Sequence, residues 1–206
     1  MSDPPISRGF RARRRRDDEL RRVPPGQHLT GDFPVLSAGP TPDIDLAAWS
    51  FSLDHGGATL GDWTWAEFEA LPQTEITVDI HCVTTWSKLD TRWRGVTIDA
   101  LLTAAGSCEA PADFTLVHCE GGYTANVPVA DLVGGKAMIA THFDDEPLAA
   151  EHGGPARLLV PHLYFWKSAK WVRRIEFVAT DQPGFWEELG YHMYGDPWRE
   201  QRYAGD

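Results

Sequence analysis

Two histidine–cysteine dipeptides, His81-Cys82 and His118-Cys119, carry the side chains of this chain best suited to chemistry. Cys82 ends a run rich in β-branched residues and precedes two threonines, so we expect it at the end of a strand. A cysteine in such a place is an inert core residue, a metal ligand or, when deprotonated, a nucleophile. The surrounding sequence must decide between these three roles.

The four side chains provide the ligand count of a Cys2His2 zinc site. However, adjacent residues on a strand point to opposite faces, so only one member of each dipeptide can face a shared ion. The spacing also lacks the close cysteine pairs of zinc modules, which disfavours zinc. A nucleophilic Cys–His pair stays open, because the sequence cannot show which histidine would lie beside Cys82.

A second set of candidate residues lies between two expected strands, at 156–161 and 170–179. Lys167, Ser168 and Lys170 bring ammonium and hydroxyl groups to a loop with free backbone N–H groups, which are the donors that a phosphate needs. A solvated basic loop is the alternative. The chain contains neither G-x-G-x-x-G nor a P-loop motif, so ordinary dinucleotide and nucleoside triphosphate sites are not indicated.

Short elements must position these residues. Apolar alternation and β-branched runs predict strands at 49–53, 75–83, 114–119, 137–142, 156–161 and 170–179, with an extended segment at 126–129. Helices are expected at 64–71, where Thr64 can cap the first turn, and at 97–106, which ends at a glycine, with one helical turn at 129–132. The fold class is therefore α+β, with mixed β-sheets and short helices.

Charge divides the chain into two parts. Residues 1–24 carry eight arginines and four acidic residues, a net of +4, and the remainder carries a net of −15. We expect 1–24 to be a flexible basic arm and 25–206 to be a single domain. The acidic body disfavours binding to nucleic acid.

Three cysteines, an odd number, do not suggest a disulfide framework, so a reducing, cytoplasmic location is expected. No apolar run approaches the length of a membrane span. The proline-rich stretch at 33–42 is expected to be extended, and either wraps over the surface or borders a site.

Three segments, in this order, resemble the molybdopterin-binding domain of the sulfite oxidase family. They are 81–87 with 93–96, the Glu120-Gly121-Gly122-Tyr123 turn, and 152–171 with its His152-Gly153-Gly154-Pro155 start. The resemblance covers about residues 30–180. Each piece alone is weak, and their joint order is specific.

The resemblance implies one buried molybdenum–molybdopterin cofactor (Mo-MPT), with the metal held by the pterin dithiolene and by one protein cysteine, which maps onto Cys82. A soft thiolate suits a metal that already carries sulfur ligands. The expected cofactor-binding residues are Ser37, Cys82, Thr124, His142, His152, Arg157, Lys167, Ser168, Ala169 and Lys170. Cys82 and Tyr123 form the expected catalytic pair.

The chain departs from the family where sulfite oxidases carry positive charge. Their Arg-Asn-His run corresponds to Leu36, Ser37 and Ala38, and the arginine five residues after the cysteine corresponds to Ser87. Both differences remove charge expected near a sulfite anion. Three downstream residues are candidates to replace that charge: Lys88, Arg92 and Arg94.

The expected function is a molybdenum-dependent oxidoreductase that moves an oxygen atom and two electrons on a small substrate. Reduction of an S- or N-oxide and sulfite-type oxidation are both open, and the substitutions at Leu36 and Ser87 favour the first. An external redox partner is expected, because no Cys-x-x-Cys motif indicates a second redox centre. Two alternatives are a non-catalytic pterin-binding module and a cofactor-free cysteine enzyme.

Overall fold

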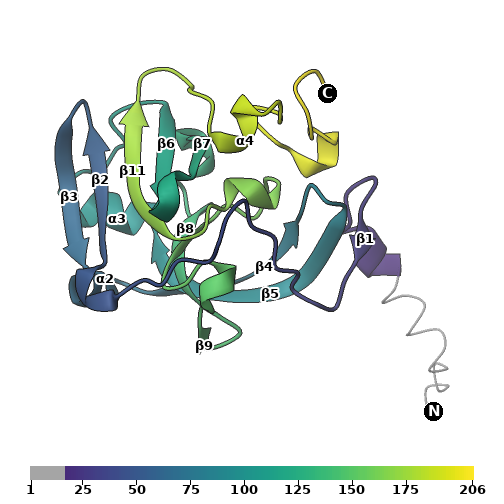
Figure 1. The fold of residues 1–206 in the computed structure, drawn as a ribbon, viewed down its shortest axis with the longest axis horizontal. Helices are drawn as coiled ribbons and strands as arrows, with labels where there is room; N and C mark the ends of the chain where they lie inside the picture. The colour runs from purple at the N-terminus through teal and green to yellow at the C-terminus, as the bar shows by residue number, and fades with distance from the viewer. Residues whose placement is uncertain (1–16) are drawn as a thin grey trace, which may run out of the picture.

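The computed structural model describes residues 17–206 and contains two mixed sheets (Figure 1). The first has the order β1-β5-β8-β10, with β4 paired to β5 and β9 to β8. Its strands are β1 (His28–Leu29), β4 (Thr74–His81), β5 (Trp86–Thr97), β8 (Met138–Phe143), β9 (Glu146–Pro147) and β10 (Arg157–Leu159). The second has the order β3-β2-β11-β6-β7. It consists of β2 (Ser50–His55), β3 (Ala58–Thr64), β6 (Phe114–Cys119), β7 (Thr124–Pro128) and β11 (Val172–Val178).

Helices are short and few in the described part of the chain, which confirms the α+β class with mixed sheets. They are α2 (Trp65–Glu69), α3 (Ile98–Ala104) and α4 (Phe185–Glu188), with 3-10 turns at Leu46–Ala48, Glu120–Gly122, Val129–Asp131, Ala150–His152, Phe165–Lys167 and Pro197–Arg199. The predicted cap of α2 is present as a capping box between Thr64 and Glu67. None of the helices in residues 17–206 is long and apolar enough to span a membrane.

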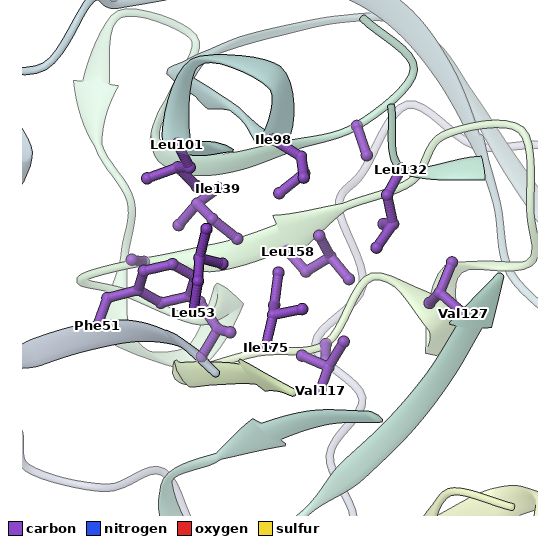
Figure 2. Close-up of a cluster of buried hydrophobic side chains, with 14 of the residues drawn as sticks. Phe51, Leu53, Ile98, Leu101, Val117, Val127, Leu132, Ile139, Leu158 and Ile175 are labelled. Atoms are coloured by element: carbon purple, nitrogen blue, oxygen red, sulfur yellow. The ribbon is translucent and has the colours of Figure 1, made fainter. Parts of the chain in front are cut away.

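The main core explains the alternating pattern of the strands (Figure 2). On β2, Phe51 and Leu53 are fully buried, whereas Ser50 is exposed and Ser52 only partly covered. They pack with side chains of α3, β8, β10 and β11, namely Ile98, Leu101, Ile139, Leu158 and Ile175. A second apolar cluster surrounds Cys82 and includes Ile80, Trp86, Trp93, Met138, Leu159 and Phe165.

The sequence patterns did not predict the two-residue strands β1 and β9 or the longer strands β3 and β5. Charged side chains interrupt β5, and it nevertheless pairs with β1, β4 and β8. At Gly95 the neighbouring strand is so close that a Cβ would lie 2.1 Å from the Ile139 carbonyl oxygen. Tertiary packing therefore outweighs local propensity here. β3 lies at a sheet edge, where β2 is its paired neighbour, and most of its residues are exposed or only partly buried, so it lacks a clear apolar alternation.

Only the last part of the expected basic arm can be compared with the structure, because residues 1–16 lie outside the described residues. Within 17–24, Arg22 contacts the body: its Nε donates to Asp79 at 2.9 Å, and its Nη2 lies 2.6 Å from Asp90 Oδ1. The end of the arm is thus attached to the β4–β5 hairpin.

Candidate functional site

A cavity of about 640 Å³ collects the three segments singled out in the sequence. Its walls come from the proline-rich stretch 33–42, the turn 82–86, the turn 120–123, the segment 152–171 and the C-terminal stretch 185–191. Its volume falls in the range of small-molecule and cofactor sites, which have mostly apolar walls and a few convergent polar groups.

Cys82 lies where β4 turns into β5. Its N–H donates to the Trp86 carbonyl at 2.9 Å, and its carbonyl accepts from the Thr85 N–H at 3.0 Å, which closes a tight turn. The Sγ atom lies 3.2 Å from the Thr84 hydroxyl. Burial raises the pKa of the Cys82 thiol. Such a thiol becomes a ready nucleophile only if a base activates it.

The neighbouring histidine does not supply that base. His81 is buried, and its Nδ1 lies 2.8 Å from the Ser87 hydroxyl. Among residues 17–206, no histidine forms a hydrogen bond with Cys82 Sγ, and no group of three or more His, Cys, Asp or Glu side chains is placed to hold a metal ion. Among residues 17–206, Cys82 is therefore placed to bind a metal as a single protein ligand at the wall of the cavity.

The Cys82 turn is held from outside by two side chains. Gln27 donates from Nε2 to the Cys82 carbonyl at 3.1 Å, and Arg202 donates from Nη1 to the Val83 carbonyl at 2.6 Å. The Arg202 guanidinium also stacks 5.1 Å from the centre of the Tyr164 ring. Segments near both ends of the chain thus fix the position of the cysteine.

Arg157 is a buried cation with no acidic partner. Its side chain donates to the His152 and Ser168 carbonyls at 2.7 and 2.5 Å, and its Nε has no partner. Within residues 17–206 no carboxylate forms an ion pair with it, and burial lowers its pKa. A buried charge is costly unless it is paired, so this site is complementary to an anionic ligand.

Lys170 is a second cation at the cavity; it is half-buried, and no carboxylate of residues 17–206 forms an ion pair with it. Its Nζ donates to the Leu36 and Glu151 carbonyls at 2.7 and 2.6 Å, which ties the proline-rich stretch to the segment 152–171. Burial lowers the pKa of Lys170 to about 8. The chain passes close by at Gly153, where a Cβ would lie 3.1 Å from the Lys170 backbone, and Gly153 has a φ of +109°. This close approach explains a glycine in the His-Gly-Gly-Pro motif.

Most of the expected site residues line this one cavity. These are Ser37, Cys82, Tyr123, His152, Arg157, Ser168, Ala169 and Lys170. Their individual roles stay predictions. The Tyr123 hydroxyl donates to the Trp166 carbonyl at 2.9 Å, so its proton is engaged with the protein backbone, and burial raises its pKa well above the ordinary value.

Three expected residues do not line the cavity. Lys167 is 0% exposed and is bound by the Asn126 backbone and side-chain oxygens, the Met193 carbonyl and Glu187. Thr124 begins β7 and pairs with His118. His142 lies on β8 opposite Pro147 of β9, with its Nδ1 2.9 Å from the Thr141 hydroxyl.

The three candidates to replace the missing positive charge also lie elsewhere. Lys88 donates to the Gly31 carbonyl at 2.6 Å, Arg92 pairs with Asp145 at 2.6 Å, and Arg94 is not part of the cavity wall. Arg157 and Lys170 are the only Lys or Arg residues that line the cavity among the described residues.

The sequence reasoning missed several parts of the site. Gln27, Thr84 and Arg202 surround the cysteine turn, and Phe185, Trp186 and Tyr191 add an aromatic wall. The aromatic content of the C-terminal stretch is the signal in the sequence that could have indicated that wall. The proline-rich stretch borders the site, which is one of its two expected roles.

The comparisons with known proteins agree with this arrangement. A family model described as the oxidoreductase molybdopterin binding domain matches residues 38–186. The uncharacterized oxidoreductase YuiH of Bacillus subtilis is 43% identical over 197 residues, which cover 93% of this chain and 97% of YuiH. The putative protein-methionine-sulfoxide reductase subunit YedZ1 of Azospira oryzae is 26% identical, with 86% of this chain and 68% of that protein covered.

More distant relatives are longer than this chain. The mitochondrial sulfite oxidase of Drosophila melanogaster is 25% identical, and the match covers 77% of this chain but 32% of that enzyme. The crystal structure of the sulfane dehydrogenase SoxCD from Paracoccus pantotrophus superposes with a TM-score of 0.58 at 19% identity, covering 68% of this chain and 40% of the SoxCD chain. This likeness shows the fold alone. The family model and the 43% identical relative show that the chain belongs to the oxidoreductases with a molybdopterin-binding domain of the sulfite oxidase type.

Proposed function

We propose that this chain binds molybdenum–molybdopterin in the cavity through Cys82 and carries out two-electron oxygen-atom transfer on a small substrate. One observation carries the proposal: a single cavity brings a lone cysteine thiol together with two partly or fully buried cations, Arg157 and Lys170, that no carboxylate of residues 17–206 pairs with. The thiol suits a soft metal, and the cations suit an anionic cofactor.

The residues present fit such a group. Arg157 keeps an unpartnered Nε, and the hydroxyl oxygen of Ser168 accepts the Val160 N–H at 2.9 Å, which leaves the hydroxyl proton to donate. His152 stacks on Phe33 with ring centres 3.9 Å apart, and burial lowers its pKa, which favours the neutral imidazole. When bound, the cofactor supplies a metal that exchanges an oxygen atom and two electrons with the substrate.

The cavity favours a neutral substrate such as an S- or N-oxide over sulfite. Both cations that line it already donate to backbone carbonyls and belong to the expected cofactor contacts. Leu36 lines the wall where a sulfite oxidase has arginine, and Ser87 is fully buried beside His81. A site for a small dianion needs additional positive charge, which the described walls do not offer. The similarity to a methionine-sulfoxide reductase subunit supports the same choice.

Electrons are expected to come from an external redox protein, since the sequence carries no motif for a second redox centre. The three cysteines are free in the structure, which is compatible with the expected reducing, cytoplasmic location.

The test begins with metal and pterin content. Protein expressed with molybdate is analysed by mass spectrometry, with Cys82→Ser as the variant and Cys108→Ser as the control, because Cys108 is exposed and lies outside the cavity wall. We expect about one molybdenum per wild-type and control chain and a strong loss in Cys82→Ser. Stoichiometric zinc, or no molybdenum in the wild type, would refute the proposal.

Turnover distinguishes the enzyme from a non-catalytic pterin-binding module. Loaded protein is assayed for reduction of small sulfoxides and N-oxides with a reduced dye as donor, and for sulfite oxidation with an artificial acceptor. We expect oxide reduction that disappears in Cys82→Ser. Full molybdenum occupancy without turnover of any of these substrates would favour the binding module.

A further inference from the structure

The hydroxyl of Thr84 faces the sulfur of Cys82. The two atoms lie 3.2 Å apart, and Thr84 is an exposed residue of the cavity wall. Thr84 belongs to the turn that the Thr85 N–H closes onto the Cys82 carbonyl at 3.0 Å. The turn therefore directs a hydroxyl group back to the side chain two residues earlier.

The position of this hydroxyl is fixed by the frame around the turn. Gln27 and Arg202 bind the carbonyls of Cys82 and Val83, and Thr85 takes the left-handed backbone conformation with a φ of +75°. Such a conformation is unusual for a β-branched residue and persists where the surroundings determine it. The contact between Thr84 and the sulfur is thus part of a built turn.

The direction of the hydrogen bond follows from the state of the sulfur. In a free thiol either atom can donate, but a cysteine that holds a metal is a thiolate and has no proton. The Thr84 hydroxyl is then the donor. Because this bond comes from a side chain, a substitution at Thr84 can remove it and leave the backbone of the turn in place.

Hydrogen bonds to a sulfur ligand withdraw electron density from it and stabilise the more electron-rich, reduced state of the metal. We propose that Thr84 is a positioning residue that raises the reduction potential of the metal centre by donating its hydroxyl hydrogen bond to the Cys82 sulfur. The inference rests on the proposed function and adds a residue that acts on the metal only through its ligand.

Two variants isolate the hydroxyl group. Thr84→Val keeps the branched shape and removes the donor, and Thr84→Ser keeps the donor and removes the methyl group. Both are made in the full chain loaded with cofactor, and the potential of the molybdenum couple is measured by redox titration of its electron paramagnetic resonance signal. Loss of the bond is expected to change the one-electron equilibrium constant about tenfold.

A tenfold change in the one-electron equilibrium constant corresponds to about 59 mV, so we expect the midpoint potential of Thr84→Val to be lower than that of the wild type by this amount. Thr84→Ser is expected to stay close to the wild type, and the resonance signal should change in Thr84→Val alone. The molybdenum content should be equal in all three proteins. An unchanged potential in Thr84→Val at full occupancy overturns the inference, as do equal shifts in Thr84→Val and Thr84→Ser.

The failure of this inference is distinguishable from failure of the proposed function. If the wild type holds molybdenum and loses it in Cys82→Ser, the cofactor site stands whatever the Thr84 variants do. A change in KM alone, with the potential unchanged, would make Thr84 a substrate contact and overturn the inference. If the wild type binds no molybdenum, both proposals fail together.

Discussion

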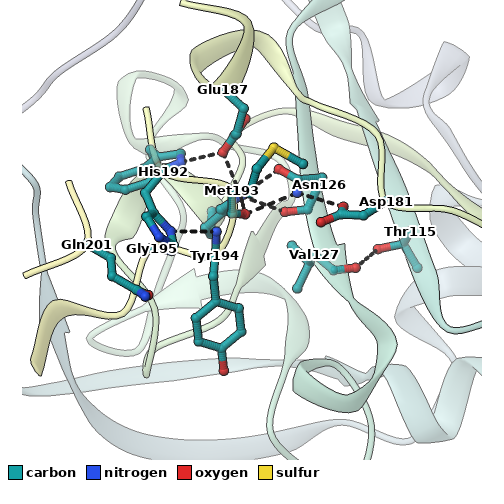
Figure 3. Close-up of polar contacts among 12 residues, drawn as sticks. Thr115, Asn126, Val127, Asp181, Glu187, His192, Met193, Tyr194, Gly195 and Gln201 are labelled. Carbon is teal, nitrogen blue, oxygen red and sulfur yellow. Dashed lines mark hydrogen bonds and ion pairs between the residues drawn. The ribbon is translucent and has the colours of Figure 1, made fainter. Parts of the chain in front are cut away.

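The buried ion pair of Lys167 and Glu187 leads to a prediction about stability, which tests whether Lys167 stabilises the fold or binds the cofactor. Its side chain and that of Glu187 are both 0% exposed, and their charged atoms lie 2.6 Å apart. The ammonium also donates to the Asn126 carbonyl, the Asn126 side chain and the Met193 carbonyl at 3.0, 2.6 and 2.7 Å. Figure 3 shows Asn126 bound in turn to Asp181 and Met193, so the network joins β7 to the C-terminal stretch.

Lys167→Met leaves the Glu187 carboxylate buried without its countercharge. Breaking a buried ion pair in this way costs about 3–5 kcal/mol of unfolding free energy, which for a chain of this size lowers the Tm by about 6–20 °C. Urea unfolding of the cofactor-free protein measures the loss. Lys167→Met with Glu187→Gln is expected to recover part of it, because the glutamine removes the uncompensated charge and can still accept from the Trp166 indole.

Lys136→Met is the matched control, because Lys136 is exposed and its ammonium donates to the Ala130 carbonyl at 2.7 Å, without an ion pair among residues 17–206. It is expected to change stability by no more than about 0.5 kcal/mol. The reasoning is refuted if Lys167→Met costs less than about 1 kcal/mol while molybdenum occupancy falls. That outcome would place Lys167 at the cofactor, as its sequence position beside Ser168 suggests.

Four further predictions concern the cations around the cavity. Since the pKa of Lys170 is about 8 in the cofactor-free protein, cofactor retention on gel filtration should weaken above that pH in the wild type and stay constant in Lys170→Arg. The same lowered pKa means that the unfolded chain holds this proton more tightly, so Lys170 should make stability increase with pH between about 8 and the ordinary value of 10.5. Arg202→Met should release the Val83 carbonyl and speed limited proteolysis near the Cys82 turn, whereas Arg202→Lys should preserve the contact. Arg157→Met should abolish molybdenum retention at a smaller cost in unfolding free energy than Lys167→Met, as measured on the cofactor-free proteins.

The parts of the fold that could be predicted from the sequence are those set by local chemistry. Two local patterns are retained in the structure: the apolar alternation at Phe51 and Leu53, and the capping box at Thr64. Tertiary contacts did not change either of them. β5 breaks that alternation with charged residues, and its strand conformation depends on pairing with β4 and β8. No local rule contains that information, so the longest strand was missed.

The candidate site also combines residues that the sequence indicates with residues that only tertiary contacts bring there. Cys82 and the segment from His152 to Lys170 were found because the residue types and their order carry the chemistry. Gln27 and Arg202 were missed because they reach the Cys82 turn from positions far away in the chain, through carbonyl groups that every residue has. A contact to a backbone carbonyl leaves no signature in the sequence of its acceptor.

Lys167 and Arg157 show what the structure adds to the sequence: it shows whether a buried cation has a countercharge within the protein. Both are buried cations of one segment, and residue type and position alone assign both to the cofactor. The structure separates them by countercharge. Lys167 has Glu187, whereas Arg157 donates to the His152 and Ser168 carbonyls, lies over the Phe165 ring and forms no ion pair with a carboxylate of residues 17–206. A buried charge that the protein itself neutralises contributes to the fold, and one that it leaves unneutralised is complementary to a ligand of opposite charge. The combination of burial with a missing carboxylate therefore predicts that Arg157 binds the ligand and that Lys167 stabilises the fold.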